Sequence, residues 1–202
     1  MRLTTRRLAI IGMLGAVSVV LQLTPLGFII LPFSPVRATI MHVPVIIAAI
    51  VEGPAAGILV GLIFGGFSIY NAAVNPVSPI SFVFLDPVVA ILPRLLIGVT
   101  SYYAYIMIKS ALISKVGEKA AAVTAIGFAA VVGTLTNTIG VLSAIFLRHL
   151  AEFAEGLGIA VETAGAAIVG IGLSHGLPEL IVAVLIVIPV VQGVSRLYGR
   201  QF

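Results

Sequence analysis

Basic residues are distributed unevenly along a nearly continuous apolar chain, and this pattern constrains the fold more than any other feature of the sequence. Eight of the eleven lysines and arginines lie in three short stretches: Arg2, Arg6 and Arg7, then Lys109, Lys115 and Lys119, then Arg196 and Arg200. Only 9% of all residues are charged, whereas soluble domains have roughly 25%. Because basic residues that flank membrane helices stay on the cytoplasmic side, we expect a polytopic membrane protein with all three stretches in the cytoplasm.

Six apolar runs are candidates for membrane helices, which need about 20 residues to cross the hydrocarbon layer. We expect helices over residues 8–23, 38–51, 55–71, 87–108, 120–147 and 177–194. Asp86 and Pro87 fit an N-cap and a first helical residue at the start of the fourth run. The sequence therefore predicts an all-α integral membrane protein: a six-transmembrane-helix bundle with both termini cytoplasmic, in which residues 1–202 form a single membrane-embedded domain.

The connections between these runs divide by charge. The loop over residues 110–118 is basic, and the same pattern places it in the cytoplasm. The connections over residues 25–37, 72–85 and 148–176 then lie outside, and the last of them carries Glu152, Glu155 and Glu162. That segment is long for a simple loop, so we expect a short re-entrant or interfacial helix within it.

Polar residues at membrane depth are costly and mark functional sites in many membrane proteins. Arg94 follows Pro87 by seven residues, so it lies about 10 Å along its helix at 1.5 Å per residue. The other candidates near this depth are Asn71, Asn75, Asn137, His42, His175 and Glu179. All fall in the outer half of the expected bundle, and the inner half has almost no polar residue before the lysines. This asymmetry favours a pocket open to the outside over a pore, which needs polar residues along its full depth.

Structural roles for the same residues remain open alternatives. Arg94 could form a salt bridge with Asp86 or Glu179, and Asn137 could join two helices by a hydrogen bond. His42 could cap its own helix. Tyr102, Tyr103 and Tyr105 are expected in an aromatic belt at the inner interface.

Small residues share one face of the first helix. Gly12 and Ala16 are four residues apart, and Ala9 lies beside them. Such a face lets two helix backbones approach closely in lipid. The partner could be a helix of the same chain or a separate membrane subunit.

Signatures of enzymes are absent from the sequence. It contains no Walker A loop, His-Glu-x-x-His, Ser-x-x-Lys or Gly-x-Ser-x-Gly motif. The pairs His149–Glu152 and His175–Glu179 have the wrong spacing for a standard metal site. Nucleic-acid binding is not indicated either, because the sequence contains no basic face with aromatic partners. We expect no enzymatic activity, no metal and no cofactor.

Four segments, residues 39–50, 52–66, 92–99 and 176–183, together resemble one family of membrane proteins. The first two are similar to the second and third helices, and the last two to the fourth and sixth helices, of the S components of energy-coupling factor (ECF) transporters. Within the family the chain looks most like the pantothenate-specific branch, chiefly over residues 39–44, 81–84 and 176–183.

The resemblance implies a vitamin-binding subunit in the cell (cytoplasmic) membrane. Such a subunit captures its substrate outside and works with a membrane coupling subunit and two ATPase subunits. Family members dock through small residues on the first helix, which here are Ala9, Gly12 and Ala16. The substrate-binding residues expected from the polar pattern and the resemblance are Arg94, Asn71, Asn75, Asn137, His42, His175 and Glu179, with Phe28, Phe33, Phe82 and Phe84 lining or closing the pocket.

Other substrates and another class of transporter remain alternatives at this point. Folate, riboflavin, hydroxymethylpyrimidine, cobalamin or lipoate could replace pantothenate. A stand-alone secondary transporter is also possible, although no broken inverted repeat is visible in the sequence.

Overall fold

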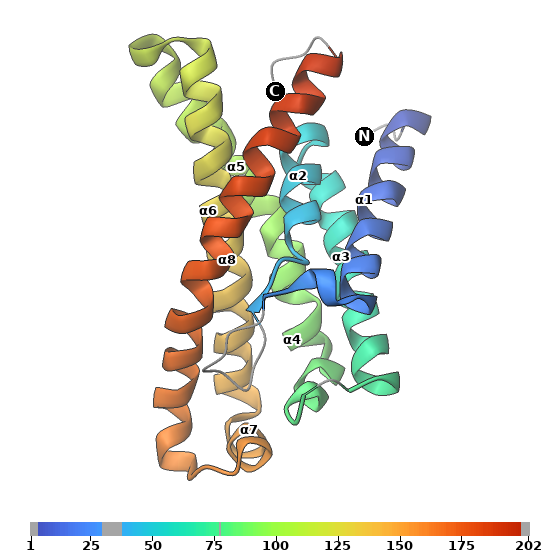
Figure 1. The fold of residues 1–202 in the computed structure, drawn as a ribbon, viewed down its shortest axis with the longest axis vertical. Coiled ribbons are helices and arrows are strands. Elements are labelled where there is room, and N and C mark those ends of the chain that lie inside the picture. The colour runs from blue at the N-terminus through green and yellow to red at the C-terminus, as the bar shows by residue number, and fades with distance from the viewer. Residues whose placement is uncertain (1–3, 30–37, 77, 199–202) are drawn as a thin grey trace.

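The computed structural model describes residues 4–29, 38–76 and 78–198, and these residues are almost entirely helical (Figure 1). The helices are α1 (Thr5–Leu23), α2 (Val43–Glu52), α3 (Pro54–Val74), α4 (Pro87–Ala90), α5 (Leu92–Val116), α6 (Glu118–Arg148), α7 (Leu150–Leu157) and α8 (Val161–Tyr198). Two 3₁₀ turns, η1 (Pro25–Gly27) and η2 (Ser81–Leu85), and two short strands, β1 (Phe28–Ile29) and β2 (Ala38–Thr39), complete the described elements. The strands pair antiparallel, with Phe28 opposite Thr39.

Within the described residues, five segments are long and apolar enough to cross a membrane: residues 5–23, 54–74, 87–116, 118–148 and 161–197. The expected all-α membrane fold is therefore supported. The second expected helix differs, because its residues 38–42 form β2 and a turn and α2 has only ten residues. Ten helical residues extend about 15 Å, half of the hydrocarbon thickness.

Helix α2 occupies the centre of the bundle. All residues from Val43 to Val51 are buried, and α2 contacts α1, α3, α5, α6 and α8. A helix that is apolar on all sides is stable only when it is surrounded by protein or lipid. Here protein surrounds it, which explains how so short an apolar helix is accommodated. Figure 1 shows that α2 begins about midway along the bundle, beside the β1–β2 hairpin.

The last outer connection is shorter than the sequence predicted. Residues 148–176 contain the short helix α7, as expected, but α8 begins at Val161 and continues without a break through Pro178 and Pro189. His175 and Glu179 therefore lie within a long helix rather than at its start. The expected loop over residues 110–118 is also mostly helical, because α5 extends to Val116 and only Gly117 separates it from α6. Gly117 has a φ of 81°, a conformation that favours glycine.

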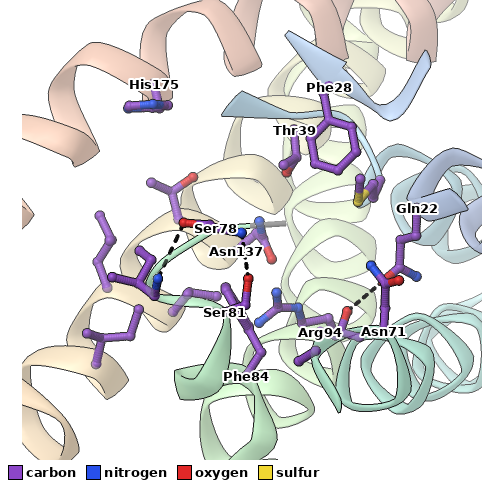
Figure 2. Close-up of a pocket in the computed structure, with 18 of the residues that line it drawn as sticks. Gln22, Phe28, Thr39, Asn71, Ser78, Ser81, Phe84, Arg94, Asn137 and His175 are labelled. Carbon is purple, nitrogen blue, oxygen red and sulfur yellow. Dashed lines mark hydrogen bonds between the residues drawn. The ribbon is translucent and has the colours of Figure 1, made fainter. Parts of the chain in front are cut away.

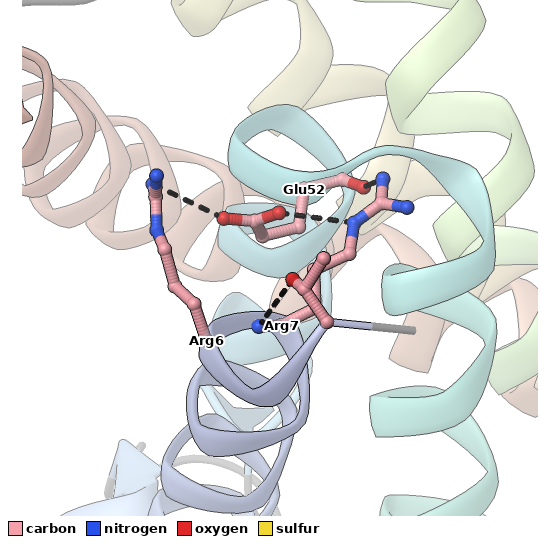
Figure 3. A network of polar contacts seen from close by, with 4 residues as sticks. Arg6, Arg7 and Glu52 are labelled. Carbon is pink, nitrogen blue, oxygen red and sulfur yellow. Dashed lines mark hydrogen bonds and ion pairs between the residues drawn. The ribbon is translucent and has the colours of Figure 1, made fainter. Parts of the chain in front are cut away.

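The described parts of the basic stretches lie at one end of the bundle, which we call the basic end (Figure 1). The start of α1, the turn between α5 and α6 and the end of α8 are all found there. Figure 3 shows how the start of α1 is attached at this end: Arg6 and Arg7 converge on Glu52, the last residue of α2. Arg7 Nε donates to the Glu52 carboxylate at 3.1 Å, and Arg6 forms an ion pair with it at 3.3 Å. Arg7 also donates to the backbone carbonyl of Glu52.

Two apolar clusters fill the bundle. One surrounds α2 and includes Ile46, Phe64 and Ile97. The other joins the η2 region to α6, α7 and α8 and includes Val83, Ile145 and Phe153.

Tyr105 belongs to the first cluster and is 2% exposed, so its expected place in an aromatic belt is wrong. Ser101 is fully buried one turn away, so buried polar residues also occur below Arg94.

Candidate functional site

A cavity of about 210 Å³ lies between these two apolar clusters. Its volume far exceeds the roughly 15 Å³ that one buried water requires, so it can accommodate a small molecule. Its walls come from α1, the β1–β2 hairpin, α3, the segment before α4, α5, α6, α7 and α8. The polar residues in the wall are Gln22, Thr39, Ser68, Asn71, Asn75, Ser78, Ser81, Arg94, Asn137, Thr138, His175 and Glu179.

Arg94 is the principal cation of this cavity (Figure 2). It lies in the first turn of α5 and is 5% exposed. Its Nη1 donates to the carbonyl of Val89 at 2.6 Å, while its buried Nε has no hydrogen-bond partner among the described residues. The guanidinium also lies over two aromatic rings, 5.1 Å from the centre of Phe64 and 5.4 Å from that of Phe84.

No ion pair between described residues involves Arg94. Asp86, one of its possible partners, instead pairs with Arg148 at 2.5 Å and with His149 at 3.0 Å. Glu179, the other possible partner, accepts hydrogen bonds from Thr39 and Thr138. The salt-bridge alternative for Arg94 is therefore wrong, and the guanidinium keeps a donor for a further acceptor.

The structure brings seven of the expected site residues to the cavity wall: Arg94, Asn71, Asn75, Asn137, Phe84, His175 and Glu179. Phe28 of β1 also lines it. Phe33 lies outside the described residues. Asn137 is 6% exposed, and within the described part of the chain its side-chain oxygen has no hydrogen-bond partner. Its alternative role of joining two helices through that oxygen is therefore not observed.

Two expected residues do not line the cavity. Phe82 lies in the same 3₁₀ turn as Ser81 and Phe84, but three residues per turn place Ser81 and Phe84 on one side and Phe82 on another. Its ring faces Gly156 of α7. His42 is fully buried and hydrogen-bonds Thr134 of α6 at 2.9 Å. Its side chain does not cap α2.

Several lining residues were absent from the sequence-based set. Gln22 and Ser68 hydrogen-bond each other at 2.9 Å across α1 and α3. Gln22 is a polar residue within an apolar run, and the rule that indicated Asn137 could have found it. Thr39 and Thr138 carried no comparable signal, because threonine is common in membrane helices and strands.

The small residues of α1 divide between two faces. Ala9, Gly12 and Ala16 are exposed, and a Cβ at position 12 would meet no atom of the described residues within 4 Å. Gly15 is buried instead, and a Cβ there would approach Ile63 of α3 to 2.7 Å. Packing within the chain therefore uses Gly15, and the face with Gly12 is left uncovered.

Two comparisons with known proteins identify transporters that are similar to this chain. The family model described as "ECF transporter, substrate-specific component" matches residues 6–191. The curated pantothenic acid transporter PanT of Lactococcus lactis subsp. cremoris (strain MG1363) is similar to this chain, with 32% identity over 203 residues. The alignment covers 93% of each protein.

Proposed function

We propose that this chain, which belongs to the family of ECF transporter substrate-specific components, captures pantothenate outside the cell membrane for import. The chain is a multi-pass membrane transport subunit and not an enzyme. Delivery would require a membrane coupling subunit and two ATPase subunits. The similarity to a protein named as a pantothenic acid transporter supports the choice of substrate.

The proposed topology has six membrane-embedded helices, with the short α2 enclosed by the other five. Both termini and the α5–α6 turn would be cytoplasmic, because the basic stretches share one end of the bundle (Figure 1). The segments that line the cavity from 78 to 84 and from α7 lie toward the opposite end, so the cavity would face the outside. We also propose that residues 1–202 act as one domain.

Arg94 is the observation that carries the proposal. Pantothenate bears one carboxylate, and a guanidinium with an unused Nε–H offers it a charge-assisted hydrogen bond. The aromatic rings of Phe64 and Phe84 exclude water around the guanidinium, and an ionic hydrogen bond is stronger in a less polar environment. A buried cation without an ion-pair partner is costly for the empty protein, and an anionic ligand would remove that cost.

The exposed small face of α1 is the proposed contact with the coupling subunit. Ala9, Gly12 and Ala16 have no large side chain that would keep a second helix away.

Binding to the purified protein in detergent tests the proposal. Pantothenate should raise the melting temperature of the protein, because a ligand that binds only the folded state stabilises it. Folate, riboflavin, hydroxymethylpyrimidine, cobalamin and lipoate, tested in the same way, should have no comparable effect. Stabilisation by one of these and not by pantothenate would assign a different vitamin.

Substitution of Arg94 tests the carboxylate contact. Arg94→Gln should weaken pantothenate binding by about 2–5 kcal/mol, as for truncation of one partner of a buried charge pair. Arg94→Lys should restore only part of the loss, because an ammonium lacks the planar fork of the guanidinium. Arg196→Gln, at the basic end, is the matched control and should bind normally. If Arg94→Gln keeps its affinity, the carboxylate is bound elsewhere.

A further inference from the structure

Glu179 gives the cavity a second ionisable group, carried by a different helix from Arg94. It lies in α8 and is 6% exposed. One carboxylate oxygen accepts from the backbone N–H of Thr39 at 2.6 Å, and the other accepts from the Thr138 hydroxyl at 3.0 Å. Each carboxylate oxygen can accept two hydrogen bonds. The group therefore retains capacity for donors of a ligand.

Glu179 and Arg94 line one cavity and are not paired with each other. Opposite charges in a poorly hydrated site attract strongly, yet these two groups bind other partners. Here Arg94 uses the carbonyl of Val89 and Glu179 uses Thr39 and Thr138. The cavity is thus positive at α5 and negative at α8.

Asn137 of α6 supplies an uncharged group between these walls. It is adjacent in sequence to Thr138, which contacts Glu179, and in the view of Figure 2 it lies between Thr39 and Arg94. No described residue hydrogen-bonds its buried side-chain oxygen. A buried acceptor without a donor is unfavourable, so this oxygen is suited to an N–H of the ligand.

From this order of groups we infer that the bound ligand is an elongated monoanion with its carboxylate at Arg94, an amide N–H at Asn137 and hydroxyl groups at Glu179. The inference rests on the proposed function and adds an orientation and a basis of selectivity to it. Pantothenate has these groups in this order along its length. The Glu179 carboxylate also repels a carboxylate placed beside it, so it disfavours the reversed orientation and ligands with an acid at both ends.

Affinities of pantothenate and two analogues test the orientation. Pantothenol replaces the carboxylate with a hydroxymethyl group, and a deoxy analogue replaces the terminal hydroxyl with hydrogen. Wild-type protein should bind each analogue at least about tenfold more weakly than pantothenate, because a hydrogen bond to a charged group is lost in each case.

Two variants then assign each end of the ligand. Arg94→Gln should abolish the preference for pantothenate over pantothenol and keep the preference over the deoxy analogue. Glu179→Gln should abolish the preference over the deoxy analogue and keep the preference over pantothenol. Glu162→Gln changes an exposed glutamate of the same helix and should keep both preferences. Melting temperatures of the ligand-free variants check that the Thr39 contact of Glu179 is not needed for folding.

The possible results separate the hypotheses. If Glu179→Gln abolishes the preference over pantothenol instead, the ligand lies in the opposite direction and the inference is wrong. If Glu179→Gln weakens all three ligands equally, Glu179 only holds β2 in place, and the inference is again wrong. Should Glu179→Gln fail to fold, the wild-type series still decides, since a deoxy analogue that binds as tightly as pantothenate overturns the hydroxyl contact. Absence of any pantothenate binding by wild-type protein would reject the proposed function itself.

Discussion

Gly61 of α3 lies against the backbone of Arg94, so closely that a Cβ at position 61 would come within 2.3 Å of the Arg94 carbonyl oxygen. Gly57 and Gly65, one turn to either side, make similar contacts with Gly98 and Ala90. This row of glycines lets α3 and the α4–α5 segment pack backbone to backbone, as small residues do in membrane helix pairs. The contact fixes the depth of Arg94 in the bundle and holds its guanidinium beside Phe64.

Gly61→Ala should therefore disturb the cavity without changing any residue that lines it. The added methyl group must push α3 away from α5, and overpacking of this kind costs roughly 1–3 kcal/mol. We expect a lower melting temperature and weaker pantothenate binding. Gly66→Ala, on the same helix but with no neighbour within 4 Å, is the matched control and should be nearly neutral. Equal effects of the two substitutions would mean that helix flexibility, rather than this contact, is responsible.

The division of small residues on α1 leads to a second prediction. Gly12→Trp or Ala16→Trp should abolish uptake of pantothenate by cells while the purified subunit still binds it, because a large side chain would block a partner helix at the uncovered face. Val17→Trp places the same bulk at an exposed position about a third of a turn around the helix from Ala16. This variant should retain uptake. Loss of binding together with uptake would indicate that Gly12 and Ala16 serve packing within the chain.

Membrane orientation can be tested cleanly because the chain has no cysteine. Ser114, near the end of α5, and Ala160, just before α8, are both exposed. A cysteine at position 160 should react with a membrane-impermeant thiol reagent in intact cells, whereas one at position 114 should react only after the cells are permeabilised. The opposite labelling would place the basic end outside and contradict the proposed topology.

Hydropathy and turn residues predicted most helices but not all their ends. The start of α4 is confirmed, since Asp86 accepts from the backbone N–H of Val88 at 2.9 Å as an N-cap. The start of α2 was placed five residues early, although Pro44 in its first turn indicated the position. The start of α8 was missed because residues 161–176 are rich in glycine and alanine. Glycine disfavours helices in water, but small residues are common in membrane helices, where they let backbones pack closely.

The sequence predicted those residues of the candidate site whose type is rare within membrane helices. Arg94 and Asn137 met that criterion, and both line the cavity. The distinction between Phe82 and Phe84 depends on a 3₁₀ turn, which the apolar pattern does not reveal. The side chain of His42 is buried against Thr134 of α6, and a contact between residues so far apart in the chain leaves no signal in the sequence.

Asp86 connects two parts of the cavity wall at the end opposite the basic end. It caps α4, next to the segment with Ser81 and Phe84, and it binds Arg148 and His149 at the junction of α6 and α7. The hydrogen bond from Arg148, with those from Val88 and His149, lowers the pKa of Asp86 from 3.8 to about 2.

This lowered pKa predicts a specific acid sensitivity. A carboxyl group with a lower pKa in the folded state stabilises the fold above its unfolded pKa, and the contribution is lost as pH falls from about 4 to about 2. At pH 7, Asp86→Asn should lower the melting temperature by on the order of a few degrees. The difference from wild type should shrink as the pH falls through this window, because the wild-type carboxyl group also becomes neutral. Melting curves of both proteins between pH 7 and pH 2.5 measure this difference in melting temperature. Glu162→Gln is the control for an exposed acid. A difference that stays constant over this range would show that the charge of Asp86 contributes nothing to the junction.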